Sequence, residues 1–294
     1  MPNSTPLTIE QISQATRTLS QRRPPYAAML AFYETIFTSQ EQAKSTIALA
    51  PIQLSPEALK IRQQENLPLV DISGFSIDDA SSVHLLDRLC DLTANHGTEM
   101  KASATAVSTA LANGELDPQD LFQSLLQGDD RFFQTTAKRI GADQETLAFL
   151  AYNSIQPSVE HAAAQLAAYL DREAVWSKGY CPICGSAPGL AILGEEGRRE
   201  MCCSFCRHQW RAPRIFCAFC ENTAVDELHY FFAEEESDLR VDGCDRCRRY
   251  LKCVDRRKAS RPLYPPLEQI ASLHLDIIAA EKGFRGGVEL NIDQ

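Results

Sequence analysis

The sequence predicts an α+β protein in which a helical N-terminal domain precedes two tandem rubredoxin-like or zinc-ribbon metal-binding modules and a C-terminal helix. Three observations predict this order: helix caps fill the first half, four Cys-x-x-Cys pairs crowd the second half, and an amphipathic pattern closes the chain. The expected boundaries are 1–175 for the helical domain, 176–213 and 214–260 for the two modules, and 261–294 for the C-terminal helix and tail.

Capping residues place several helix starts in the first 175 residues. Ser55 and Asp117 each precede a proline, and a capping side chain followed by proline at the first helical position is typical of a helix N-terminus. A further helix is expected to begin at Asp143. Because proline lacks a backbone N–H, we expect Pro157 to separate that helix from another that ends near Trp176.

Short strand-like segments lie between the cysteine pairs and predict two hairpins. Residues 190–193 and 198–202 flank a Gly-Glu-Glu-Gly turn. Apolar residues alternate over 228–232, and the chain returns over 239–241 after an acidic turn. Apolar residues over 266–283 recur at helical spacing, so one amphipathic helix that buries a single face is expected there.

The four cysteine pairs predict two metal sites of four thiolates each. Two residues between cysteines let both sulfurs of a tight turn reach one ion, and a hairpin between two such turns brings two pairs together. Eighteen residues separate Cys184 from Cys203 and twenty-three separate Cys220 from Cys244, which fits ribbon or rubredoxin spacing. Either iron or zinc suits four thiolates, and each site is either structural or redox-active. The predicted ligands are Cys181, Cys184, Cys203, Cys206, Cys217, Cys220, Cys244 and Cys247.

The remaining thiols and the nearby histidines have simpler interpretations. Cys202 and Cys253 adjoin complete sets of four, so we interpret them as neighbours of the sites rather than ligands. Cys90 lies on an apolar helical face, which is typical of a small buried hydrophobic residue. With eight thiols available, neither His208 nor His229 is needed as a ligand.

Composition and charge exclude several classes of function. The formal net charge of -10 disfavours general binding to nucleic acid or anionic membranes, because the attraction to phosphate is missing. No apolar run is long enough to span a bilayer, and the N-terminus lacks the pattern of a signal peptide. We therefore expect a cytoplasmic protein without membrane insertion, in which paired cysteines indicate metal or redox chemistry rather than disulfides. Assembly into a homo-oligomer stays open.

The sequence contains no positive evidence of an enzyme. The phosphate-binding, dinucleotide-binding and nucleophile-elbow motifs are all missing from the sequence, so no catalytic or organic-cofactor residues are assigned. A basic run over 246–258 favours the alternative of a zinc-ribbon nucleic-acid binder. We interpret this run as a solvated or partner-facing surface, and we expect the aromatic residues around it to be core. These aromatic residues are Trp210, Tyr230, Phe231, Phe232 and Tyr250.

The cysteine segments resemble those of the FdhE family of formate dehydrogenase accessory proteins. The segments that carry this resemblance are CPICGSAPGLAI, CSFCRHQW, CAFCEN, HYFF and CDRCRRYLK. RRPPYAAMLAFYETIF near the N-terminus and LEQIASLHLDIIAAEKGF near the C-terminus are similar to the family as well. The resemblance covers most of the chain and is most specific from Cys181 to Lys252.

The resemblance implies a helical N-terminal region, rubredoxin-like double metal sites that bind iron, and a cytoplasmic location. It also implies contact with the catalytic subunit of respiratory formate dehydrogenase, a molybdenum- or tungsten-dependent protein, before that subunit is exported. The eight paired cysteines match the family's motif positions, whereas Cys202 and Cys253 do not. We therefore expect a non-catalytic maturation factor. A rubredoxin-type electron carrier and, after it, a nucleic-acid binder are the alternatives.

Overall fold

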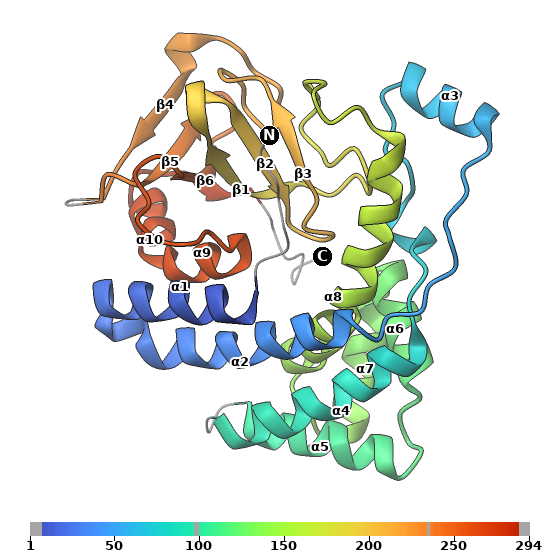
Figure 1. Ribbon diagram of the computed structural model, residues 1–294. Coiled ribbons are helices and arrows are strands. Elements are labelled where there is room, and N and C mark those ends of the chain that lie inside the picture. Colours follow the sequence, from blue (N-terminus) through green and yellow to red (C-terminus); the bar gives the residue numbers. More distant parts are fainter. Residues whose placement is uncertain (1–7, 97–99, 234–235, 288–294) are drawn as a thin grey trace. The chain divides into compact units, whose positions relative to one another are not determined.

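The computed structural model describes residues 8–96, 100–233 and 236–287 (Figure 1). The chain divides into two compact units, each assembled from separated stretches. The sheet unit comprises Met1–Leu30, Gln53–Val70 and Leu166–Gln294, and the helical unit comprises Ala31–Ile52 and Asp71–Gln165. The predicted succession of a helix-rich region and a region with strands and two four-cysteine groups is confirmed. The domain boundaries drawn from the sequence remain predictions.

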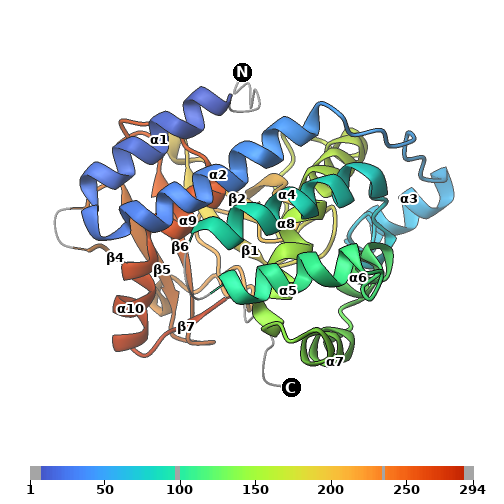
Figure 2. The ribbon, with the colours of Figure 1, turned by 90° about the horizontal axis from the view of Figure 1, so that it is seen from below.

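Amphipathic helices build the helical unit, and Figure 2 shows α4 and α5 running side by side. Their apolar faces meet in a core that fully buries Leu86, Phe122 and Leu150. Among the described residues, no helix combines the length with the apolar composition that a bilayer crossing demands. The helices are α2 (Ala27–Lys44), α4 (Asp79–His96), α5 (Lys101–Ala112), α6 (Pro118–Gln127), α7 (Asp130–Ile140) and α8 (Gln144–Leu166).

The predicted helix starts are confirmed. The Ser55 hydroxyl accepts a hydrogen bond from the Ala58 N–H at the start of α3 (Pro56–Gln64). The Asp117 carboxylate accepts one from the Gln119 N–H at the start of α6, and α8 begins directly after Asp143. Each side chain satisfies a backbone donor that the first helical turn leaves without a partner.

The expected helix break at Pro157 is wrong, because α8 runs through this proline. A proline removes the N–H that would bond to the carbonyl four residues earlier, which here belongs to Asn153. In the folded chain the Gln40 side-chain amide donates to that carbonyl oxygen over 2.9 Å. Gln40 is itself fully buried. A residue more than a hundred positions away thus satisfies the carbonyl that the proline leaves free.

One mixed sheet joins both predicted modules (Figure 1). The strand order is β3-β2-β1-β6-β5-β4, with the short β7 also paired to β6. The predicted hairpins β1–β2 and β4–β5 are confirmed as antiparallel pairs. Strands β1 and β6 pair in parallel, with Ala191 opposite Cys253. The strands are β1 (Pro188–Leu193), β2 (Arg199–Cys203), β3 (Gln209–Ala212), β4 (Leu228–Phe231), β5 (Leu239–Cys244), β6 (Arg249–Asp255) and β7 (Arg285–Gly286).

Two helices near the C-terminus cover one face of this sheet, where the sequence predicts one continuous helix. They are α9 (Pro265–Ala271) and α10 (Leu273–Glu281), and they are broken at Ser272. The Ser272 hydroxyl donates to the Glu268 carbonyl oxygen over 2.6 Å, which favours a bend. The break changes the buried face: Leu275 is fully buried against the sheet, whereas Ile277 is 62% exposed. The expectation of one buried stripe is therefore wrong.

A buried group of ion pairs ties α1 (Ile9–Arg22) and α9 to the loop before β5. Arg261, whose side chain is fully buried, binds both Glu268 and Asp238 through its guanidinium. Arg22 donates to both oxygens of Asp238, at 2.7 and 2.8 Å. Although burial acts to raise it, the hydrogen bonds from Arg22 and Arg261 bring the pKa of Asp238 below its usual range. Their arginine partners therefore offset the cost of burying these two carboxylates.

We expect Arg261→Met to destabilise the sheet unit by roughly 3–5 kcal/mol, because it leaves Glu268 and Asp238 buried with less positive charge nearby. Urea unfolding followed by tryptophan fluorescence measures this, since both tryptophans, Trp176 and Trp210, lie in the sheet unit. Arg198→Met is the matched control, with an expected change below about 1 kcal/mol for its exposed ion pairs. Equal effects of the two substitutions would contradict the prediction.

Candidate metal centres

Each Cys-x-x-Cys pair lies on a tight turn at the end of a strand or just before one. The first pair precedes β1, and the second begins at the end of β2. The third lies between β3 and β4, and the fourth begins at the end of β5. Because β1–β2 and β4–β5 are hairpins, each hairpin brings two of these turns to the same end of the sheet.

The four turns share one backbone conformation. In each, the residue directly after the second cysteine has a positive φ: 79° at Gly185, 57° at Arg207, 58° at Glu221 and 56° at Arg248. In the first turn the Gly185 N–H donates to the carbonyl oxygen of Cys181 over 2.9 Å. Glycine adopts this conformation freely, whereas the other three residues do so at a cost of about 1–2 kcal/mol each. Surrounding contacts must therefore hold three of the turns closed.

The first group of four sulfurs has the dimensions of a tetrahedral metal site. The Sγ atoms of Cys181 and Cys206 lie 3.7 Å apart, and that of Cys184 lies 3.5 Å from Cys203 and 3.6 Å from Cys206. Sulfurs about 2.3 Å from one tetrahedral ion would lie about 3.8 Å from one another. All four side chains are buried.

The second group has the same dimensions and is more exposed. The Sγ atoms of Cys217 and Cys247 are 3.6 Å apart, and those of Cys220 and Cys244 are 3.7 Å apart. Cys220 and Cys247 are only partly buried. The Asn222 side-chain amide lies 3.8 Å from the Cys244 sulfur, so a polar donor supports this site.

Backbone N–H groups point at the sulfurs of both groups. The Ile183 N–H donates to Cys181 Sγ over 3.4 Å, and the Cys206 N–H donates to Cys203 Sγ over the same distance. In the second group the Phe219 N–H donates to Cys217 Sγ over 3.5 Å. Such donors stabilise sulfur in its thiolate form, which is the form that binds metal.

Burial has the opposite effect on some of these thiols. It raises the pKa of Cys181 and of Cys206, because taking a thiolate out of water is unfavourable. A divalent cation at the centre of the group would supply the charge that buried thiolates lack. The donor set, the spacing and the burial therefore fit a bound metal ion, and the four sulfurs alone do not distinguish iron from zinc.

The structure brings all eight predicted cysteines into two groups, and in each group the four sulfurs lie within 4.8 Å of one another. Their role as ligands remains a prediction. Cys202 lies in neither group and packs in the core beneath α10. Cys253 and Cys90 are fully buried, and burial raises the pKa of each thiol to about 12. Nε2 of His229 lies 2.5 Å from the Asp245 carboxylate.

Several basic and aromatic residues around the second group differ in exposure from what the sequence predicted. Trp210 and Tyr250 are buried as expected. Tyr230 and Phe232 are 63% and 44% exposed, so their expected place in the core is wrong. Lys252, from the basic run expected at the surface, is 8% exposed and donates to the Asp276 carboxylate over 2.8 Å. Alternation alone could not reveal that Tyr230 lies on an edge strand and that Phe232 directly follows it.

Comparisons with known proteins find similarity to FdhE proteins. Residues 215–291 match the family model described as the C-terminal domain of FdhE. An FdhE homologue from Aquifex aeolicus is 27% identical over 270 residues, which cover 90% of this chain and 88% of that protein. An FdhE homologue from Haemophilus ducreyi is 29% identical over 160 residues, and this alignment spans 50% of that protein.

The crystal structure of the FdhE protein from Pseudomonas aeruginosa has the same fold. It matches with a TM-score of 0.66 at 21% identity, over 97% of this chain and 96% of that chain. The resemblance to FdhE proteins that the cysteine segments indicated is thereby confirmed. The predicted fold class is confirmed as well.

We expect Cys181→Ser to lose about one of two metal ions per chain and to destabilise the sheet unit, because three thiolates no longer close the shell. Metal analysis of the purified protein, together with thermal unfolding, measures both effects. Cys202→Ser is the matched control, since this neighbouring thiol faces the core and should leave the metal content unchanged. Metal loss in Cys202→Ser, with full content in Cys181→Ser, would show that the ligand assignment is wrong.

Proposed function

We propose that this chain is a non-catalytic accessory factor that helps assemble or activate respiratory formate dehydrogenase by binding its catalytic subunit in the cytoplasm. One observation carries the proposal: two complete four-cysteine groups lie in a fold shared with FdhE proteins. The match of residues 215–291 to the FdhE C-terminal domain places the second group within the matched region.

In this proposal each four-cysteine group holds one metal ion, iron or zinc, through the eight cysteines named above. An ion bound by four thiolates supplies a cross-link between two turns, in addition to the hydrogen bonds that hold each turn closed. The first ion would join the turn before β1 to the turn after β2. The second would join the turn before β4 to the turn after β5. The ions would therefore fix the sheet whose edges and loops are offered to the partner.

A rubredoxin-type electron carrier is a second candidate, and the exposure of the second group favours it. Cys220 and Cys247 are partly exposed, so electrons would have a short path from the surface to an ion bound there. Protein purified from its native host distinguishes the two functions. An electron carrier requires bound iron and a reversible change of absorbance on reduction. Colourless, zinc-loaded protein from that host would exclude the carrier.

We expect tagged protein to recover the formate dehydrogenase catalytic subunit from its native host. The Cys181→Ser/Cys217→Ser variant should recover several-fold less, because both cross-links are lost and the sheet unit loosens. Mass spectrometry of the recovered proteins measures this, with metal analysis of the bait alongside. Circular dichroism of the variant checks that its helices remain folded.

The Cys202→Ser chain is the control bait and should recover as much subunit as the wild type. Recovery of nucleic acid in place of the subunit would favour the ribbon-type nucleic-acid binder. If wild-type bait with full metal content recovers neither, the maturation role is contradicted.

A further inference from the structure

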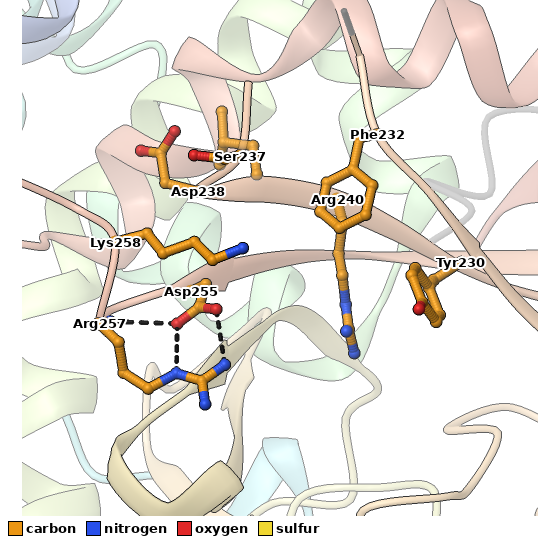
Figure 3. A pocket seen from close by; sticks show the side chains of 9 residues that line it. Tyr230, Phe232, Ser237, Asp238, Arg240, Asp255, Arg257 and Lys258 are labelled. Atoms are coloured by element: carbon orange, nitrogen blue, oxygen red, sulfur yellow. Dashed lines mark hydrogen bonds and ion pairs between the residues drawn. The ribbon is translucent and has the colours of Figure 1, made fainter. Parts of the chain in front are cut away.

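A pocket of about 200 Å³ opens on the sheet unit beside the outermost strand β4 (Figure 3). Two aromatic side chains, Tyr230 and Phe232, lie on one side of it, and Lys258 and Arg257 lie on the other. Arg240 extends from β5 between them. The pocket therefore combines apolar surface with positive charge, and neither cysteine group contributes to it.

The two aromatic rings are unusually exposed for their size. Tyr230 is 63% exposed and Phe232 is 44% exposed, and the rings meet edge to face at 5.7 Å with planes 83° apart. The Arg240 guanidinium lies 4.9 Å from the centre of the Tyr230 ring, and the Lys258 ammonium lies 5.8 Å from that of Phe232. Aromatic residues and arginine with this exposure are the side chains most enriched at protein interfaces.

The charges around the pocket leave a positive excess. Asp238 turns its carboxylate to Arg22, and its side chain is only 4% exposed. Asp255 accepts two hydrogen bonds from the Arg257 guanidinium, at 2.7 and 2.8 Å. Arg240 pairs with Asp242 over 2.8 Å, so among the described residues Lys258 is the cation of this pocket without an ion pair. The pocket therefore favours an acidic group, although the chain as a whole carries a formal net charge of -10.

The pocket lies on a face of the sheet rather than at its free edge. Its lining comes from β4, from Leu239 and Arg240 of β5, and from Asp255 at the end of β6, and β5 is the strand that β4 pairs with. A second hollow shares Phe232, Ser237 and Lys258 with the pocket, so the depression continues along the chain beyond β4. This elongated shape suits an extended segment.

We propose that this pocket binds an extended segment of the formate dehydrogenase catalytic subunit that carries an acidic side chain beside an apolar one. The apolar side chain would cover Tyr230 and Phe232, and the carboxylate would pair with Lys258. This inference rests on the proposed function, because it takes its partner from it. Nucleic acid fits less well, since perpendicular rings offer no parallel platform for bases.

The test uses the full-length, metal-loaded protein and purified catalytic subunit. Lys258→Glu should weaken binding by roughly tenfold or more at low salt, because it reverses the charge that faces the acidic group. Tyr230→Ala/Phe232→Ala should weaken it to a similar degree with little dependence on salt. Lys60→Glu and Ile61→Ala on α3 are the matched controls, being an exposed cation and an exposed apolar residue away from the pocket.

A photo-crosslinking amino acid at position 232 locates the contact directly. Mass spectrometry should find it joined to a segment of the subunit that contains Asp or Glu next to an apolar residue, with no crosslink from position 61. If the wild type and all pocket variants bind equally, the pocket is wrong while the proposed function stands. If the wild type itself does not bind the subunit, both the pocket proposal and the proposed function are contradicted. Retained metal content and an unchanged circular dichroism spectrum show that each variant is folded.

Discussion

The sheet unit depends on one constraint, which is that the eight cysteine sulfurs come together in two groups of four. Each site requires four thiols within a few ångströms, and three of the four pairs of thiols come from turns with an unfavourable backbone conformation. Three of the four turns place a residue other than glycine in the left-handed region. Hydrogen bonds within the turns oppose that cost. A metal ion bound to each group would oppose it further and would fix the position of the hairpin between the two turns.

The parallel pairing of β1 with β6 turns two hairpins into one sheet, and a buried charge cluster then attaches helices to it. Arg261 lies at the centre of that cluster, between a carboxylate of α9 and one of the loop before β5. Arg22 joins α1 to the same loop. Residues from the N-terminal part of the chain are thus built into the unit that carries the cysteines. This arrangement holds Asp238, which lines the pocket.

The sequence predicted what depends on near neighbours. The cysteine turns, both hairpins and the helix starts at Ser55 and Asp117 follow from residues a few positions apart. Features set by distant partners were missed. Pro157 stays within α8 because Gln40 satisfies the carbonyl that it leaves free, and no local pattern shows this. Similarly, alternation predicts that Tyr230 lies on a strand but does not reveal that this strand is outermost, which decides its exposure.

The left-handed residue of the fourth turn has one more consequence. The Arg248 guanidinium donates to the carbonyl oxygens of Gly283 and Lys282, at 3.3 and 2.9 Å, and lies 4.3 Å from the centre of the Phe284 ring. Its own carbonyl accepts from the Arg285 N–H. The turn that presents Cys247 is therefore mechanically linked to the end of α10, while Phe284 is anchored in the core. Loss of an ion from the second group would loosen the turn that presents Cys247. Through the contacts of Arg248 it would also loosen the last residues of the described chain.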